Sequence, residues 1–187
     1  DRRVIEVPPI IWQIILNIFI LNFRPSKTAK AYKEIWMKDK NMSPLRHYTI
    51  MQSKKLKDRL AKENLLVDYA MRYGNPSINS VLTKLQKLGC EKLIVLPLYP
   101  HYAEATSLTT KLKVKEVRDA LDLDIKLSFL NEFYKEAGYI NALSKQISTY
   151  VTNDIDFLIF SYHGIPKRQN IRSNPTYEEQ VKLASKL

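Results

Sequence analysis

The sequence predicts an α/β fold, with a doubly wound, mainly parallel sheet that carries helices on both faces. Short runs rich in β-branched and aromatic residues alternate with longer amphipathic runs after Pro25. Each expected strand is followed by an expected helix, and parallel neighbours need such crossovers. Hydrophobic residues make up 45% of the 187 residues, which is ample for a packed core.

The elements follow in order from these runs. The five expected strands are the short apolar runs at residues 45–50, 65–71, 92–98, 125–129 and 156–160. The expected helices are the amphipathic runs at residues 53–64, 77–88, 107–121, 137–150 and 176–187. Gly74 to Ser77 form a turn and a helix start, and Gly164 with Pro166 stop the fifth strand. A soft domain boundary is expected near residue 130, where the fourth strand ends.

The charge balance predicts an anionic partner. Thirty Lys and Arg residues against nineteen Asp and Glu residues give a formal net charge of +11. The basic residues are spread along helical stretches with no Arg-rich arm, so nucleic acid is not the expected partner. Cys90 is the single cysteine, which excludes an internal disulfide and fits a reducing compartment.

Residues 10–23 form an apolar segment that is too short to span a bilayer and is interrupted by Gln13, Asn17 and Asn22. Two interpretations remain open. The segment is either a buried core helix, or an exposed apolar lip that touches a membrane or admits an apolar ligand. Arg24 and Lys27 follow it directly, where lipid headgroups would lie.

The carboxyl ends of parallel strands meet at one edge of a sheet, where α/β proteins hold their ligands. The chemistry-bearing residues just past the expected strands are Arg72, Tyr73, Tyr99, His101 and His163. Most of these residues also have a purely structural interpretation. Arg72 could form a surface ion pair, Tyr99 could be an aromatic residue at the edge of the core, and His101 could lie on a solvent-facing loop. His163 is the strongest candidate, because Gly164 and Pro166 end its strand and turn the backbone, which places a titratable side chain at the strand tip.

Other chemistries fit this sequence badly. It contains no G-x-G-x-x-G or P-loop motif, no nucleophile elbow and no H-E-x-x-H motif. A histidine beside aromatic residues and an arginine instead suggests a flat, apolar, acidic ligand and a transition metal that imidazole can bind.

Three motifs carry a family resemblance. FSYHGIP at residues 160–166 resembles the signature of ferrochelatases, which insert ferrous iron into protoporphyrin IX. MRYGNP at residues 71–76 and VLPLYPHY at residues 95–102 resemble two further strand-tip motifs of that family, in the same order. Residues 1–6 and 43–45 are similar as well, so the resemblance covers essentially the whole chain.

The resemblance implies a role for each candidate. His163 would accept a pyrrole proton or contact the incoming metal. The implied substrate-binding residues are Arg24, Lys27, Ser43, Arg72, Tyr73, Tyr99 and His101, with the first three near the porphyrin propionates. Residues 10–23 would be the lip over the macrocycle, which in membrane-associated members faces the bilayer.

The resemblance also implies two chelatase-like domains, residues 1–130 and 131–187, the second carrying the histidine. The implied partners are protoporphyrin IX and ferrous iron, with a membrane surface contacted through residues 10–23 and no nucleic acid. Iron is a substrate, no tightly bound cofactor is expected, and Cys90 alone cannot supply the ligands of an iron-sulfur cluster. The expected location is the cytoplasm, peripheral at the inner face of the membrane.

Family members begin earlier and continue further, into a region with a carboxylate opposite the histidine. We therefore expect a fragment without the acidic half of the site, and we expect Glu178 and Glu179 to be solvated charges on a helix. Two alternatives remain: a cobalt or nickel chelatase acting on a related tetrapyrrole, and a non-catalytic porphyrin-binding or membrane-surface module.

Overall fold

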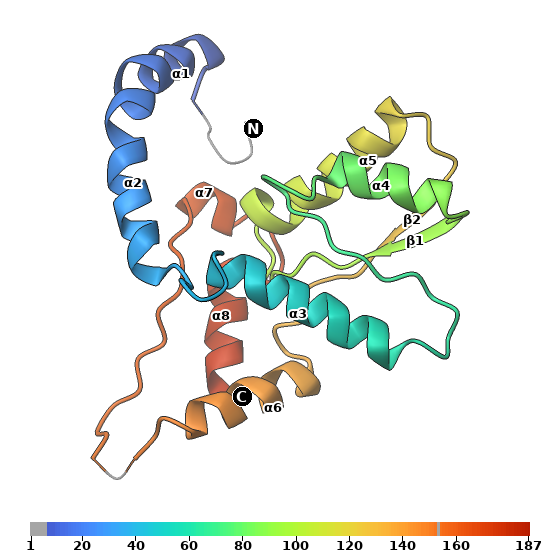
Figure 1. The fold of residues 1–187 in the computed structure, drawn as a ribbon. Helices are drawn as coiled ribbons and strands as arrows, with labels where there is room; N and C mark the ends of the chain where they lie inside the picture. Colours follow the sequence, from blue (N-terminus) through green and yellow to red (C-terminus); the bar gives the residue numbers. More distant parts are fainter. Residues whose placement is uncertain (1–6, 153) are drawn as a thin grey trace. The chain divides into compact units, whose positions relative to one another are not determined.

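The computed structural model describes residues 7–152 and 154–187 (Figure 1). Its helices and strands divide between two units of the chain. The first unit is built from Asp1–Glu91 and Ala120–Asp124, and the second from Lys92–Asp119 and Ile125–Leu187. The chain thus enters the second unit after Glu91 and returns to the first only for the turn at 120–124.

The first unit begins with a long helical segment. It consists of α1 (Pro9–Ile15), a π-helical turn η1 (Leu16–Ile20) and α2 (Leu21–Ile35). The amide group of Asn17 donates to the carbonyl of Gln13 at 2.8 Å, and that of Asn22 to the carbonyl of Ile18 at 2.8 Å. The polar residues that interrupt the apolar run therefore bond to the helix itself, and its described side chains in α1 and η1 include none that is buried.

Helix α3 (Pro44–Arg59) corrects the expected strand at residues 45–50, which was wrong. Ser43 caps this helix, because its Oγ accepts the backbone N–H of Arg46 at 3.3 Å, and Pro44 occupies the first helical position. The cap and the proline outweigh the strand-like alternation that follows them. Most of the helix expected at residues 53–64 is the second half of α3, which ends five residues earlier than expected.

Helix α4 (Ile78–Lys87) confirms the helix expected after the turn at residues 74–77. The Oγ of Ser77 accepts the backbone N–H of Ser80 at 3.1 Å and caps it. Gly89 ends it at a positive φ of 79°, with the N–H of Cys90 donating to the carbonyl of Leu85 at 3.0 Å. Its buried side chains recur at helical spacing and form the core of this unit: Ile78, Val81, Leu82 and Leu85.

The second unit contains a parallel pair of strands, β1 (Lys92–Val95) and β2 (Lys126–Phe129), which lie side by side in register from Lys92 with Lys126 to Val95 with Phe129 (Figure 1). They are connected through η2 (Glu104–Leu108) and α5 (Thr109–Ala120), as parallel strands require. Strand β1 is shorter than the expected 92–98, and Pro97 follows it without a backbone N–H to continue the ladder.

Three helices complete the second unit: α6 (Ala137–Ser148), α7 (Lys167–Asn170) and α8 (Tyr177–Lys186). The first and last confirm the helices expected at 137–150 and 176–187. The apolar core of the unit combines residues of α5, α8 and the surroundings of β2: Val114, Val117, Ile125, Tyr134, Val181 and Ala184.

The strands expected at residues 65–71 and 156–160 were wrong. Met71 makes only an isolated bridge to Ser77, and residues 156–160 form no ladder with any described part of the chain. An apolar run becomes a strand only where a neighbour takes its backbone hydrogen bonds, and the side chain of Phe157 stays 87% exposed. The structure is therefore helix-rich, with a small parallel sheet consistent with an α/β fold.

Candidate functional site

The imidazole of His101 stands at the centre of a cluster of aromatic rings in the second unit, which we call the His101 cluster. The ring stacks on Tyr134 at a centroid distance of 5.7 Å. It meets the rings of Tyr162 and Tyr177 edge to face at 5.5 and 5.9 Å. The tip of β1, the motif at residues 160–166 and the start of α8 therefore come together around one histidine.

Burial sets the protonation state of this cluster. Nε2 of His101 is buried, and none of the described groups hydrogen-bonds it. Loss of hydration lowers the pKa of His101 below its ordinary value of 6.5, so the imidazole is neutral at pH 7. Burial also raises the pKa of Tyr177, with the nearby Tyr162 as a second cause, so this phenol stays protonated. The cluster is thus a neutral, apolar wall.

His163 lies in a different environment, although it is the next residue after Tyr162. It is exposed, and it belongs to the extended segment that ends at Pro166, the residue that precedes α7. The phenol of Tyr162 is held by Ser185, with Oη and Oγ 2.8 Å apart. The imidazole of His163 therefore projects from an anchored neighbour into solvent, where it can take a proton or bind a metal.

The loop after β1 is fixed from two sides. The N–H of Phe133 donates to the carbonyl of Pro100 at 3.0 Å, which ties the loop to the segment after β2. The N–H of Tyr102 donates to Oε1 of Gln180 at 2.7 Å. Tyr99 lies on this loop with its ring partly exposed, while His101 turns toward the cluster.

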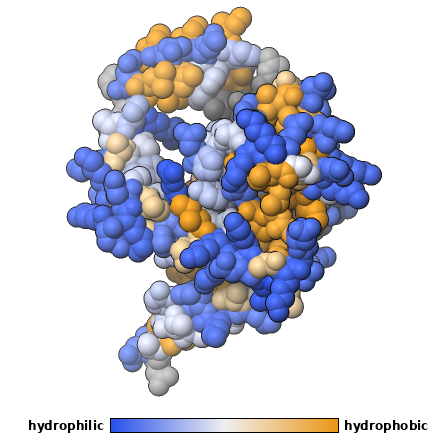
Figure 2. Space-filling model, turned by 45° about the vertical axis from the view of Figure 1, so that its right-hand side comes forward, coloured by the Kyte–Doolittle hydropathy of each residue, from blue (hydrophilic) through white to orange (hydrophobic). Residues whose placement is uncertain are grey.

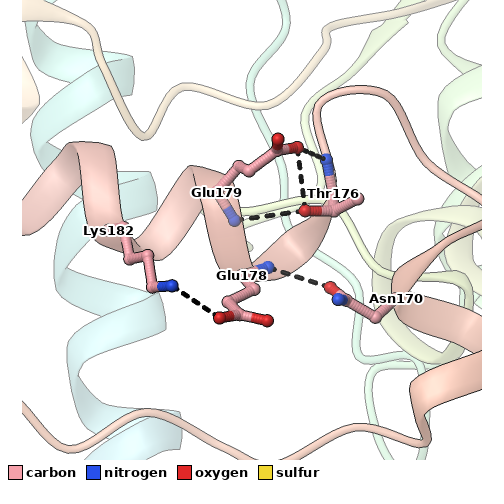
Figure 3. Close-up of polar contacts among 5 residues, drawn as sticks. All are labelled: Asn170, Thr176, Glu178, Glu179 and Lys182. Atoms are coloured by element: carbon pink, nitrogen blue, oxygen red, sulfur yellow. Dashed lines mark hydrogen bonds and ion pairs between the residues drawn. The ribbon is translucent and has the colours of Figure 1, made fainter.

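Glu178 and Glu179 lie in the first turn of α8 and make polar contacts close to it in the chain (Figure 3). Glu179 forms a capping box, because it accepts the N–H of Thr176 at 2.7 Å while its own N–H donates to Oγ1 of Thr176 at 3.3 Å. The backbone N–H and the hydroxyl of Thr176 both donate to the carboxylate, which lowers the pKa of Glu179. Glu178 lies 2.6 Å from Nζ of Lys182. Both carboxylates are exposed and bonded within their own helix start, in line with the expectation that they are surface charges.

In the first unit, Arg72 and Tyr73 lie against each other. The guanidinium carbon of Arg72 is 4.4 Å from the centroid of the Tyr73 ring, which makes a cation–π contact. Gly74 follows at a φ of 96°, a left-handed conformation that turns the chain at this point. The pair presents an exposed aromatic ring beside a positive charge, which suits an aromatic anion.

Three further candidates lie elsewhere in this unit. Arg24 and Lys27 are exposed on α2 at a spacing of three residues, so they are neighbours on one face of the helix. Ser43 is the cap of α3. Its Oγ accepts a backbone N–H, which leaves the hydroxyl hydrogen for an acceptor.

The apolar segment 10–23 is exposed along much of its length. Figure 2 shows apolar surface over α1 at the top of the view, and Ile10 is 76% exposed. These side chains are unlike those of the buried core helix that was one of the two interpretations. Among the residues that the structure describes, no helix has both the length and the apolar character needed to cross a bilayer.

Sequence reasoning did not identify four residues that shape this site: Tyr134, Tyr177, Gln180 and Ser185. Three of them lie on α8, where the amphipathic run at residues 176–187 predicted the helix but not what its residues contact. Gln180 carried no signal at all, because a polar residue on a helix is ordinarily exposed.

Within the described ranges, the structure contains no group of three or more His, Cys, Asp and Glu side chains that could hold a metal ion. Fold and site together define an α/β protein in which an exposed histidine follows a neutral aromatic cluster, and in which Arg72 pairs with an exposed tyrosine. An exposed aromatic ring beside a positive charge, as at Tyr73 and Arg72, can bind a flat aromatic anion.

Comparison with known proteins gives the family. Over residues 1–187 the chain matches the family model described as ferrochelatase, and it belongs to that family. It is 39% identical over 180 residues to the ferrochelatase of Francisella tularensis subsp. novicida, covering 95% of this chain and 54% of that protein. It is 40% identical over 191 residues to that of Brucella anthropi, covering 100% and 54%. The chain thus spans about half the length of the curated relatives it matches.

Proposed function

We propose that this protein inserts ferrous iron into protoporphyrin IX and forms protohaem, the terminal step of haem biosynthesis. Family membership and the names of the relatives support this function. The observation that carries it is the exposed imidazole of His163 directly after Tyr162, which joins the neutral His101 cluster.

The chemistry requires a base beside a dry, flat surface. When Fe²⁺ enters the macrocycle, four Fe–N bonds form, two pyrrole N–H bonds break and two protons leave, so the charge balances. The imidazole of His163 accepts one of these protons or contacts the incoming ion. An apolar wall excludes water from the ring and favours release of the protons to a positioned base rather than to solvent.

The remaining candidates bind the porphyrin in this proposal. Arg72 and Tyr73 line the pocket, with the tyrosine ring offering a flat surface to the macrocycle. Tyr99 and His101 contribute from the loop after β1. Arg24 and Lys27 neutralise the propionates and Ser43 donates a hydrogen bond to one of them.

The architecture that goes with this function is a doubly wound pair of chelatase-like domains, residues 1–130 and 131–187. Iron is a substrate, and the protein needs no tightly bound cofactor and no iron-sulfur cluster. We place the protein in the cytoplasm, peripheral at the inner face of the membrane, with the exposed segment 10–23 against lipid.

A comparison of insertion rates for different metals tests this function. The complete gene product is mixed anaerobically with protoporphyrin IX, and metalloporphyrin is followed by absorbance with Fe²⁺, Co²⁺ or Ni²⁺ supplied singly. We expect iron insertion to be the fastest. Faster insertion of cobalt or nickel would replace the proposal with a chelatase for those metals, and porphyrin binding without any metalation would replace it with a binding module.

A further inference from the structure

Helix α8 contacts the segments of both signature motifs in the second unit. Tyr177 touches the ring of His101, Gln180 bonds the backbone at Tyr102, and Ser185 bonds the phenol of Tyr162. These three residues span the whole helix, so one rigid element contacts the loop after β1 and the residue before His163. Its own start is fixed by the capping box at Thr176 and Glu179 (Figure 3).

Gln180 is the most constrained of the three. Its side chain is 1% exposed and uses both ends of the amide: Oε1 accepts the N–H of Tyr102 at 2.7 Å, and Nε2 donates to the carbonyl of Pro175 at 2.9 Å. A buried amide with both groups satisfied has a single orientation, and its loss removes the partner of the Tyr102 N–H and of the Pro175 carbonyl. Gln180 therefore fixes where the loop after β1 lies.

The bond between Ser185 and Tyr162 has a defined direction. The Oγ of Ser185 donates its only hydrogen to the carbonyl of Val181 at 2.8 Å. It consequently accepts the phenolic hydrogen of Tyr162 at 2.8 Å. The ring of Tyr162 is thus held at its hydroxyl by α8 and packed edge to face against His101, one peptide bond away from His163.

We propose that Gln180 and Ser185 are positioning residues. They hold the His101 cluster and the backbone at His163 in the arrangement that metal insertion requires. The proposal rests on the proposed function for its catalytic consequence, whereas its structural part is independent of porphyrin. Neither residue touches substrate. Each acts through the residue it bonds, so its loss should affect turnover more than porphyrin affinity.

A matched pair of variants tests Gln180 in the complete gene product. Gln180→Met keeps the length of the side chain and removes both hydrogen bonds, while Gln146→Met makes the same change on the exposed face of α6. We expect Gln180→Met to lower kcat about 10- to 100-fold with a smaller change in KM for porphyrin, and Gln146→Met to change neither. Equal kcat values for the two variants would overturn the role of Gln180.

Ser185 has an equally close control. Ser148 also donates its hydroxyl to the carbonyl four residues earlier, at 2.9 Å, but it is exposed on α6. Ser185→Ala should lower kcat about 2- to 10-fold and Ser148→Ala should not. Tyr162→Phe removes the same bond from the other side, so the double variant should be no slower than the slower single variant. If the losses in kcat of the two single variants multiplied in the double variant, the two side chains would act independently rather than through their shared hydrogen bond.

Proton NMR separates the positioning from the function. The three tyrosine rings around His101 should shift its imidazole resonances in the native protein, and Gln180→Met should move them toward ordinary values. Wild-type protein that shows the shift but neither binds nor metalates porphyrin would contradict the proposed function and leave the positioning intact. Resonances that stay in place in Gln180→Met would overturn the positioning, whatever the activity.

Discussion

His101 and His163 are the same kind of residue in opposite environments. The first is half-buried among tyrosine rings and has a lowered pKa, whereas the second is exposed beside an anchored tyrosine. This difference suits the two histidines to different roles. In the proposed function, the neutral His101 helps to form an apolar surface, and the accessible imidazole of His163 accepts a proton or contacts the metal.

The lowered pKa of His101 predicts a pH dependence of stability. Because its folded pKa lies below the ordinary value of 6.5, the unfolded chain binds more protons near that pH, and stability falls as the pH drops from about 7 toward 5. His101→Phe keeps an aromatic ring and removes the titration. Urea unfolding between pH 5 and 7.5 should give a flatter curve for the variant, and parallel curves would contradict the assignment.

The positive charges on α2 predict recognition of the porphyrin carboxylates. Lys27→Glu should weaken the binding of protoporphyrin IX about 10-fold or more, because an attraction to a propionate becomes a repulsion. Lys33→Glu, an exposed change on the same helix, is the control. Fluorescence titration measures both affinities. The effect should vanish with the uncharged dimethyl ester of the porphyrin, and an equal loss with the ester would contradict the role.

At the scale of elements, side-chain burial on α4 predicts which apolar residues hold the first unit together. Leu82 is 3% exposed and Leu88, at the end of the same helix, is 56% exposed. Leu82→Ala should lower the free energy of unfolding by about 2–5 kcal/mol, and Leu88→Ala by less than about 1 kcal/mol. Urea unfolding measures both, and similar losses would show that α4 does not bury the face assigned to it.

The sequence was sufficient for elements with their own local signals. Ser77 with the Gly74 turn predicted α4, and the apolar runs around Leu93 and Leu127 predicted the two strands that pair. It was insufficient where the outcome depends on distant partners. Residues 156–160 have a strand-like composition but no described ladder, and residues 45–50 follow the helix start at Ser43.

The site divides in the same way. Sequence motifs predicted His163, Arg72 and Tyr73 as candidates, because reactive side chains lie beside glycine and proline residues that turn the backbone there. They could not identify Gln180 or Ser185, whose importance lies in tertiary hydrogen bonds that no local pattern records. The roles of all the substrate-binding candidates remain predictions, including those of Arg24, Lys27 and Ser43.

At the scale of the whole molecule, the exposed apolar segment 10–23 predicts binding to a lipid surface. Replacing Ile10, Ile14 and Ile18 together by serine removes three exposed apolar side chains. The triple variant should cosediment with anionic vesicles much more weakly than wild type, because each buried aliphatic side chain contributes about 1.5–3 kcal/mol. Ile35→Ser, an exposed change outside the segment, is the control. Unchanged sedimentation of the triple variant would contradict the membrane contact.

The central claim is that His163 handles the proton or the metal during insertion. Its most direct test is the rate of anaerobic iron insertion into protoporphyrin IX by the complete gene product, compared with His163→Ala and with His47→Ala on α3. The account predicts that His163→Ala slows insertion about 10²- to 10⁴-fold while porphyrin still binds, and that His47→Ala stays near the wild-type rate. A His163→Ala enzyme that inserts iron at the wild-type rate would contradict it.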